Sequence, residues 1–179
     1  MIKDIKEVLF NEEDIKKKVK EISKEISRDY KGKDLVVVGV LKGSVLFAAE
    51  LIKGITIPCE IDFMAVSSYG DATESSGVVR ILKDLDHSIE GRDILIVEDI
   101  VDSGITLSYL TKYLKARKAN SIEIVTLLNK PARRKKDIHV KYIGYDVPDE
   151  FIVGYGIDYA EKYRNLPFIG VLKPEVYNK

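Results

Sequence analysis

Cysteine is nearly absent from this 179-residue sequence: Cys59 is the one such residue, so no disulfide can form within the chain. Net charge is absent too, because 29 Lys and Arg residues balance 29 Asp and Glu residues. This balance removes any global attraction to nucleic acid or to anionic membranes. No apolar run approaches the roughly 20 residues of a membrane helix, and the N-terminus lacks the apolar core of a signal peptide. We therefore expect a cytoplasmic protein.

Internal repeats, low-complexity tracts and linkers rich in Pro, Gly or Ser are also missing. The composition is 45% hydrophobic and 32% charged, which argues against disorder, collagen and coiled coil. At roughly 100–200 residues per domain, the length predicts that residues 1–179 form a single domain.

Hydrophobic patterning predicts strands that alternate with helices. The run at 35–41 is continuously apolar and rich in Val, as expected for a strand buried on both faces of a sheet. Helices are predicted at 11–30, 44–53 and 106–116, and strands at 35–41, 57–66, 78–83, 94–97, 122–128, 140–145, 151–155 and 168–172. This alternation is typical of an α/β domain with a mostly parallel twisted sheet, in which ligands bind beyond the carboxyl ends of the strands.

The segment after the central predicted strand, ILIVEDIVDSGITL, concentrates polar groups at that position. Glu98, Asp99 and Asp102 lie within five residues, and Ser103 and Thr106 flank a glycine at a predicted helix start. A small turn at a helix N-terminus exposes backbone N–H groups that bind phosphate. The acids could bind the vicinal hydroxyls of a ribose, or a Mg²⁺ ion. A substrate with a phosphate at one end and hydroxyls at the other would use both features.

A plainer interpretation is that Asp99 and Ser103 cap the helix and the other polar side chains are solvated. Capping requires one side chain, however, and this segment offers five. The sequence contains neither the Walker A pattern nor the G-x-G-x-x-G dinucleotide fingerprint.

VEDIVDSGIT resembles the signature for 5-phosphoribosyl 1-pyrophosphate (PRPP) of the type I phosphoribosyltransferases. The resemblance implies the fold of that family: a mostly parallel sheet flanked by helices, with a small hood and a flexible lid loop. An acid at this position, here Asp102, resembles the pattern of the family branch that acts on 6-oxopurines. The resemblance implies that Asp102 is the acid/base at purine N7. The residues implied to bind ribose and the 5′-phosphate are Glu98, Asp99, Asp102, Ser103, Gly104, Ile105 and Thr106.

Other segments extend the resemblance. The turn at Lys42-Gly43 is similar to the family's pyrophosphate loop, where the peptide before the lysine is often a non-proline cis bond, and Arg164 matches a pyrophosphate contact. The segment at 67–77 resembles the lid, with Ser68 and Tyr69 as its Ser-Tyr pair. The residues implied to bind the purine are Lys130, Phe151, Ile152 and Asp158.

The resemblance also implies a reaction, a cofactor and partners. Mg²⁺ is the implied cofactor, with Glu98, Asp99 and Asp158 as its ligands. PRPP would react with hypoxanthine or guanine to give IMP or GMP and pyrophosphate, in purine salvage. Family members are commonly homo-oligomers, so we expect a dimer or tetramer.

The basic run KPARRKK at 130–136 supports a competing hypothesis, because it holds five cations in seven residues. Such runs can bind nucleic acid, and some regulators with the PRPP fold bind RNA. More often a run of this kind is a solvated face or a subunit contact. His87 and His139 have no metal-ligand spacing, and we assign them no role.

Overall fold

The computed structural model describes residues 1–69 and 78–178. Most of the predicted lid at 67–77 therefore lies outside the described residues. The backbone of Ser68 and Tyr69 continues a strand, but the side chains of these two predicted lid residues also lie outside what is described.

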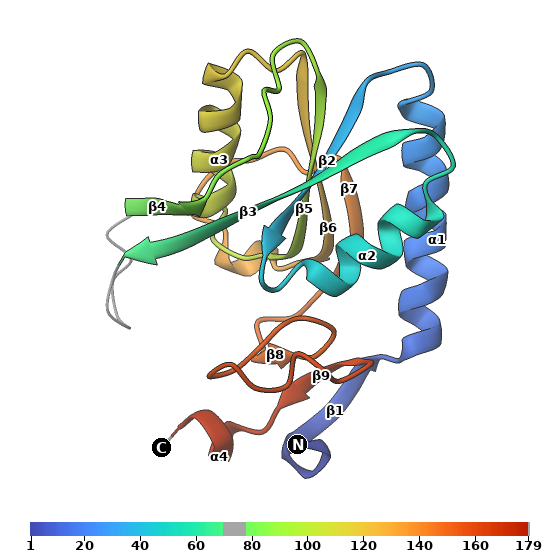
Figure 1. The fold of residues 1–179 in the computed structure, drawn as a ribbon. Coiled ribbons are helices and arrows are strands. Elements are labelled where there is room, and N and C mark those ends of the chain that lie inside the picture. The colour runs from blue at the N-terminus through green and yellow to red at the C-terminus, as the bar shows by residue number, and fades with distance from the viewer. Residues whose placement is uncertain (70–77, 179) are drawn as a thin grey trace.

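A six-stranded sheet forms the centre of the fold (Figure 1). Its neighbouring strands run parallel except for the antiparallel pair β3 and β4, so the predicted mostly parallel sheet is confirmed. In spatial order the strands are β4 (Val78–Lys83), β3 (Cys59–Tyr69), β2 (Leu35–Leu41), β5 (Asp93–Val101), β6 (Ser121–Asn129) and β7 (Tyr142–Asp146).

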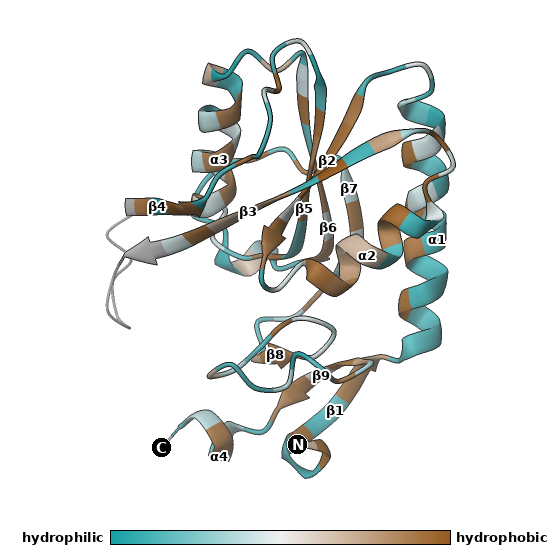
Figure 2. Cartoon of the chain, in the orientation of Figure 1, coloured by the Kyte–Doolittle hydropathy of each residue, from teal (hydrophilic) through white to brown (hydrophobic). Residues whose placement is uncertain are grey.

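Helices cover both faces of this sheet, as the continuous apolar strands require. Helices α1 (Glu12–Asp29) and α2 (Val45–Gly54) pack on one face, and α3 (Ile105–Ala116) packs on the other. Alternate residues of the central strands supply the two cores: Leu95 joins the α1 and α2 side, whereas Ile94 joins the α3 side. The hydropathy colouring shows brown, hydrophobic segments along β2 and β5 in the middle of the sheet (Figure 2).

Local sequence signals fix the ends of α1 as predicted. Asn11 accepts a hydrogen bond from Asp14 N, and the Asp14 side chain accepts one from Asn11 N, which makes a complete capping box. The buried positions Ile15, Val19 and Ile22 lie on one face of the helix. The capping box thus determines where α1 begins, and the apolar positions determine which face of it packs on the core.

A second, three-stranded antiparallel sheet forms the hood below the central sheet (Figure 1). It pairs β1 (Ile5–Phe10) with β9 (Ile169–Leu172) and β9 with β8 (Ile152–Val153); the short helices η1 (Ile2–Asp4), η2 (Pro131–Arg133) and α4 (Pro174–Tyr177) complete the chain. The prediction contained no strand near residue 5, because β1 alternates poorly and its partner lies at the other end of the sequence. The predicted strand at 151–155 is shortened to β8.

Two predicted boundaries are wrong for one reason. The strand predicted at 94–97 is too short, because β5 continues to Val101, where Ile100 and Val101 still pair with Leu128 and Asn129 of β6. Likewise β3 continues beyond residue 66, where it pairs with β4. In both places a neighbouring strand extends a segment whose polar side chains had indicated a loop. No helix in the described part of the chain has the length and apolar character needed to span a membrane.

Candidate active site

Three loops meet at the carboxyl edge of the central sheet, because parallel strands end on the same side. They follow β2 at 42–44, β5 at 102–104 and β6 at 130–134, and the hood contributes residues 150–164. Most described residues that the sequence predicted for the site belong to these loops, to the adjoining strand ends or to the hood, and Ile105 and Thr106 lie in the first turn of α3.

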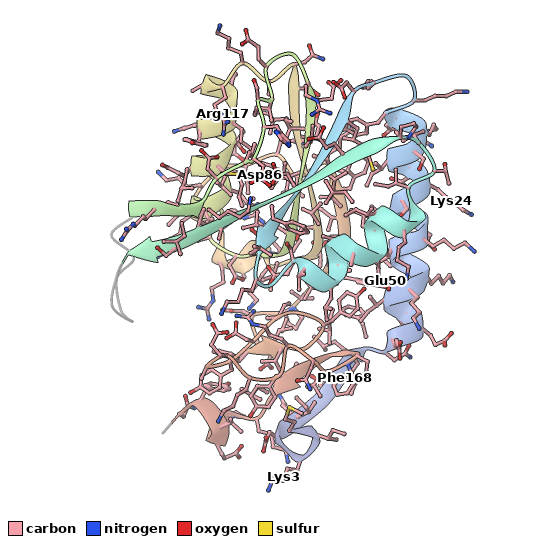
Figure 3. All side chains as sticks on the ribbon, in the orientation of Figure 1. Lys3, Lys24, Glu50, Asp86, Arg117 and Phe168 are labelled. Carbon is pink, nitrogen blue, oxygen red and sulfur yellow. The ribbon has the colours of Figure 1, made fainter. Side chains whose placement is uncertain are left out.

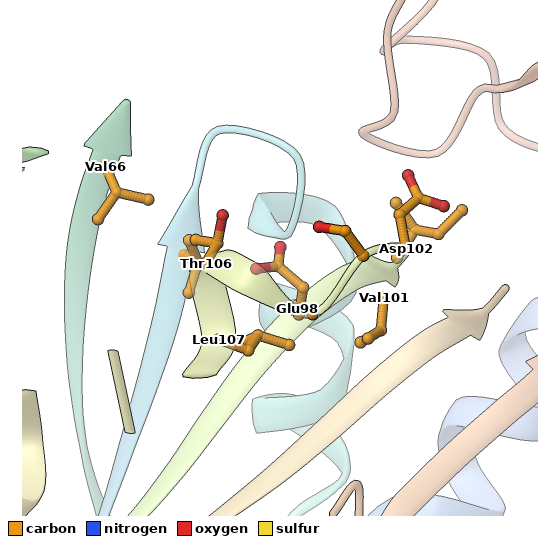
Figure 4. A pocket seen from close by; sticks show the side chains of 10 residues that line it. Val66, Glu98, Val101, Asp102, Thr106 and Leu107 are labelled. Atoms are coloured by element: carbon orange, nitrogen blue, oxygen red, sulfur yellow. The ribbon is translucent and has the colours of Figure 1, made fainter. Parts of the chain in front are cut away.

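A cavity of about 290 Å³ lies between the end of β5 and the start of α3. Glu98, Ser103 and Thr106 supply its polar groups, and Figure 4 shows the Glu98 carboxylate and the Thr106 hydroxyl directed to the same opening. Gly104 adopts φ +74 in the left-handed region and is the N-cap of α3, a conformation that glycine adopts without strain. The cavity therefore combines a helix N-terminus, hydroxyls and a carboxylate.

Glu98 and Asp99 form a tightly coupled acid pair at the end of β5. Burial, followed by the proximity of Asp99, raises the pKa of Glu98 well above its usual range. Burial also raises the pKa of Asp99, although hydrogen bonds and the charge of Arg164 oppose this effect. Two carboxylates in this state favour a ligand that supplies positive charge or hydrogen-bond donors.

The loop after β2 approaches this acid pair very closely. The Leu41–Lys42 peptide bond is cis, as the family resemblance implied. A Cβ added to Gly43 would overlap the Asp99 carboxylate, and one added to Gly156 would overlap the Gly43 carbonyl. Glycine at position 43 thus lets a backbone segment lie directly against Asp99.

A second cavity, of about 300 Å³, adjoins the first, and Ile100 and Asp102 line both. The Lys130 side chain is 9% exposed; its Nζ donates to the Glu150 carbonyl at 3.0 Å and lies 3.6 Å from Asp102 Oδ1. A buried cation and a half-exposed carboxylate therefore form an ion pair in the lining of this cavity.

Aromatic rings form another wall of the second cavity. Phe151 is stacked on Tyr177 with ring centroids 4.8 Å apart and meets Tyr159 edge-on. Phe151 is 37% exposed, so it is not the core residue that its apolar neighbours would suggest. Ile152 is buried in β8 beside it.

Hood residues place a cluster of charges opposite the acid pair. Arg164 forms an ion pair with Asp158 at 2.9 Å, and it donates to Glu161 at 3.3 Å and to the Gly156 carbonyl at 2.8 Å. Lys42 also contacts Glu161, at 3.1 Å. Arg164 Nε is buried and has no partner among the described residues, as expected of a group that binds an anion.

Three residues of the site were missed from the sequence: Glu161, Arg133 and Tyr177. Ala160 and Glu161 both have positive φ, in a tight turn closed by the bridge between Tyr159 and Lys162. Non-glycine residues rarely adopt this conformation, so no local signal indicated the turn. Arg133 and Tyr177 line the second cavity only through tertiary packing.

The acid pair fits a magnesium ion in its donor chemistry. Mg²⁺ binds protein through one or two carboxylates and keeps waters and substrate oxygens as its other ligands. Within residues 1–69 and 78–178, no three Asp, Glu, His or Cys side chains converge as a closed metal site. Asp158 is engaged by Arg164, apart from Glu98 and Asp99. An ion here would thus be shared between protein and substrate.

The sheet edge thus combines a helix N-terminus with hydroxyls, an acid pair and an adjoining second cavity, which is the arrangement that the resemblance to the phosphoribosyltransferases implied. Residues 7–160 match the phosphoribosyl transferase domain family, and the chain belongs to that family.

Within it, the chain is similar to proteins that act on 6-oxopurines. It is 60% identical to the hypoxanthine-guanine phosphoribosyltransferase of Bacillus subtilis over 97% of each chain. A crystal structure of a Staphylococcus aureus hypoxanthine phosphoribosyltransferase, 58% identical, superimposes with a TM-score of 0.97 over 100% of this chain and 97% of that one. The structure of a Trypanosoma cruzi hypoxanthine phosphoribosyltransferase, 43% identical, superimposes with a TM-score of 0.92 over 97% of this chain and 94% of that one.

Proposed function

We propose that this protein transfers the 5-phosphoribosyl group of PRPP to N9 of hypoxanthine and guanine, giving IMP or GMP and pyrophosphate in purine salvage. The observation that carries the proposal is the pair of adjoining cavities that share Asp102. One cavity has the groups for a ribose phosphate and the other has those for an oxopurine. Asp102 stands where the two substrates would meet.

Each part of the site has a role in this proposal. The loop of Ser103, Gly104, Ile105 and Thr106 binds the 5′-phosphate, and Glu98 and Asp99 bind the ribose hydroxyls. Lys42, Gly43 and Arg164 bind pyrophosphate. Support comes from Arg164 Nε, which has no partner within the described part of the chain, and from the backbone at Gly43, which lies against Asp99.

The chemistry follows from charge. As the C1–pyrophosphate bond breaks, positive charge develops on the ribose ring, and the carboxylates beneath it stabilise that charge. Purine N9 attacks C1, and the Asp102 carboxylate accepts the proton from N7. Lys42 and Arg164 stabilise the negative charge on the departing pyrophosphate.

Magnesium is the proposed cofactor. Glu98 and Asp99 would hold the ion at the ribose, and Asp158 would hold one beside the pyrophosphate. When bound, Mg²⁺ supplies positive charge to the diphosphate oxygens. Burial raises the pKa of both Glu98 and Asp99, and the charge of Asp99 raises that of Glu98 further; a divalent cation would favour the charged form of both acids, which supports this assignment.

Base selection rests on Lys130. Its ammonium group can only donate hydrogen bonds, which suits the 6-oxo group of hypoxanthine and guanine and does not suit the amino group of adenine. Phe151 stacks on the purine, and the backbone of Ile152 hydrogen-bonds the purine edge. Burial of Lys130 beside Asp102 supports this orientation.

The alternative of an RNA-binding regulator is not supported. Three of the five cations in KPARRKK have partners within the protein: Lys130 contacts Asp102, Arg133 contacts Asp149 at 2.6 Å, and Arg134 contacts the Asp102 carbonyl at 3.2 Å. They are therefore not free to bind phosphates along an RNA strand.

The deciding experiment measures nucleotide formation from PRPP and Mg²⁺ with hypoxanthine, guanine, xanthine, adenine and uracil in parallel, and with EDTA as a control. We expect IMP and GMP, and loss of both with EDTA. Product from adenine or uracil alone would contradict the role of Lys130 and Asp102. No product from any base would contradict the proposal itself. The cytoplasmic location, the single domain spanning 1–179 and the dimer or tetramer stay predictions.

A further inference from the structure

The basic run at 130–136 packs against the phosphate-binding loop. Its backbone N–H groups at Lys135 and Lys136 donate to the Ser103 carbonyl at 2.9 and 3.0 Å, and Lys130 N donates to the Val101 carbonyl at 3.0 Å. A Cβ added to Gly104 would lie 3.1 Å from the Lys136 carbonyl oxygen. The run therefore forms the outer wall of this loop.

Arg134 makes the side-chain contacts of this wall. Its Nε donates to the Asp102 carbonyl at 3.2 Å, and its Nη2 donates to Asn129 Oδ1 at 2.5 Å. Asn129 in turn donates to Asp146 at 2.6 Å. The guanidinium group thus connects the end of β6, next to Lys130, with the backbone of Asp102.

The direction of these contacts matters for the loop. In a trans peptide the C=O and N–H groups point in opposite directions. The carbonyls of Asp102 and Ser103 are both held toward the basic run, so the N–H groups of Ser103 and Gly104 point away from it. Among the described residues, the first cavity is lined by Ser103 and Gly104 and by no residue of the run. The cavity therefore lies away from the run, as these N–H groups do.

We infer that Arg134 is a positioning residue: it fixes the Asp102–Ser103 peptide so that the loop N–H groups face the phosphate and the Asp102 carboxylate faces the purine. The inference rests on the proposed function. Arg134→Lys would keep the positive charge but remove the forked guanidinium group, which contacts Asp102 and Asn129 at the same time. The geometry of Arg134, and not the charge of the run, is what the reaction requires.

The test compares Arg134→Lys with Arg92→Lys. Arg92 also makes a forked contact, to Asp34 at 2.8 Å and Glu60 at 2.6 Å, but it precedes β5 at the edge of the sheet opposite the site. We expect Arg134→Lys to lower kcat/KM by roughly tenfold or more, since it weakens charged hydrogen bonds. Arg92→Lys lowers the melting temperature and leaves kcat unchanged. A kcat/KM for Arg134→Lys within about twofold of the parent would overturn the inference.

A double-mutant cycle separates positioning from general loss of structure. In the Asp102→Asn background, Arg134→Lys should lower kcat far less than in the parent, because the group that it positions is already disabled. Equal losses in both backgrounds would contradict action through Asp102. If Arg134→Lys does not fold, Asn129→Ala removes the second anchor while keeping the arginine. It should show the same dependence on Asp102, and additive losses would again overturn the inference.

Failure of the proposed function can be told apart from failure of this inference. If the parent protein forms no nucleotide, the proposed function is wrong. The inference about Arg134 is then tested by the binding of ribose 5-phosphate. Ribose 5-phosphate should shift the amide ¹⁵N resonances of Ser103 and Gly104 in the parent and in Arg92→Lys. It should bind Arg134→Lys several-fold more weakly, by roughly the factor expected for a charged hydrogen bond. Equal affinity in all three proteins would overturn the inference.

Discussion

Acidic side chains in two regions of this molecule have opposite surroundings. Asp62, in β3, is 7% exposed and accepts hydrogen bonds from Phe63 N at 2.7 Å, from Asp86 N at 2.8 Å and from Lys83 at 3.3 Å. Burial alone would raise its pKa, but these donors outweigh burial and lower it. Asp86 lies beside α3, away from the hood that carries Phe168 (Figure 3). In this region the fold itself satisfies the acid.

Glu98 and Asp99 at the carboxyl edge have fewer donors: Asp99 N donates to Glu98 at 3.2 Å, and Ile100 N donates to Asp99 at 2.7 Å. Burial and their mutual repulsion raise the pKa of Glu98 well above normal, and burial raises that of Asp99. The fold thus stabilises the charge of the structural acid and destabilises the charge of the site acids. Acids in this state are complementary to a ligand that brings positive charge or hydrogen-bond donors, and they lie where the motif predicts the site.

Replacing a site acid should cost activity most. In Asp102→Asn the amide cannot accept the N7 proton, so kcat should fall by roughly 10²–10⁴, the usual contribution of a general base. Asp102 is half-exposed, and we expect the melting temperature and the KM for PRPP to change little. Steady-state kinetics with hypoxanthine would measure this. Unchanged turnover would remove Asp102 from the mechanism.

Replacing Asp62, the structural acid, should lower the stability of the fold and leave the activity unchanged. Asp62→Asn loses the ion pair with Lys83 and part of its acceptor capacity, which costs roughly 1–3 kcal/mol of unfolding free energy. Because the folded pKa of Asp62 is lowered, its stabilisation is present above the unfolded pKa, about 3.9, and is lost as pH falls further. Urea titrations at pH 7 and pH 3 should therefore differ, with the larger loss at pH 7. Activity per folded molecule should match the parent.

Glu98→Gln should show the opposite pH dependence in the unliganded protein. A raised folded pKa means that the fold loses stability as pH rises above the unfolded value of about 4.3. Glutamine removes this loss of stability. The melting temperature of Glu98→Gln should therefore be higher than that of the parent at pH 8 and equal to it at pH 4. Asp62→Asn is the control, since it melts lower at pH 8. A Glu98→Gln protein that melts lower at pH 8 would contradict the comparison.

The sheet and its acidic edge were predictable because their signals are local. The run at 35–41 and the acids after residue 97 each lie within a few consecutive residues, and parallel strands bring their ends together without further information. The extension of β5 to Val101 was not predictable, since it depends on pairing with β6.

The hood was harder to predict because its contacts join distant parts of the chain. Strand β1 has alternation too weak to indicate a strand and pairs with β9, more than 150 residues away. The motif from Phe151 to Arg164 predicted which residues would matter, but not the turn that brings Glu161 to them. That turn places Ala160 and Glu161 at positive φ, which no sequence pattern here favours.

The smallest effect that we predict is that of replacing Glu161. Its carboxylate contacts both Lys42 and Arg164, and their hydrogen bonds lower its pKa. These cations are the proposed pyrophosphate ligands, so Glu161 competes with PRPP for them. Glu161→Gln should lower the KM for PRPP by about two- to fivefold, as expected for exposed ion pairs, and leave the melting temperature unchanged. Glu90→Gln is the matched control, because its exposed pair with Lys118, at 3.2 Å, lies outside the site. A higher KM for PRPP in Glu161→Gln would mean that Glu161 orders the two cations instead of competing for them.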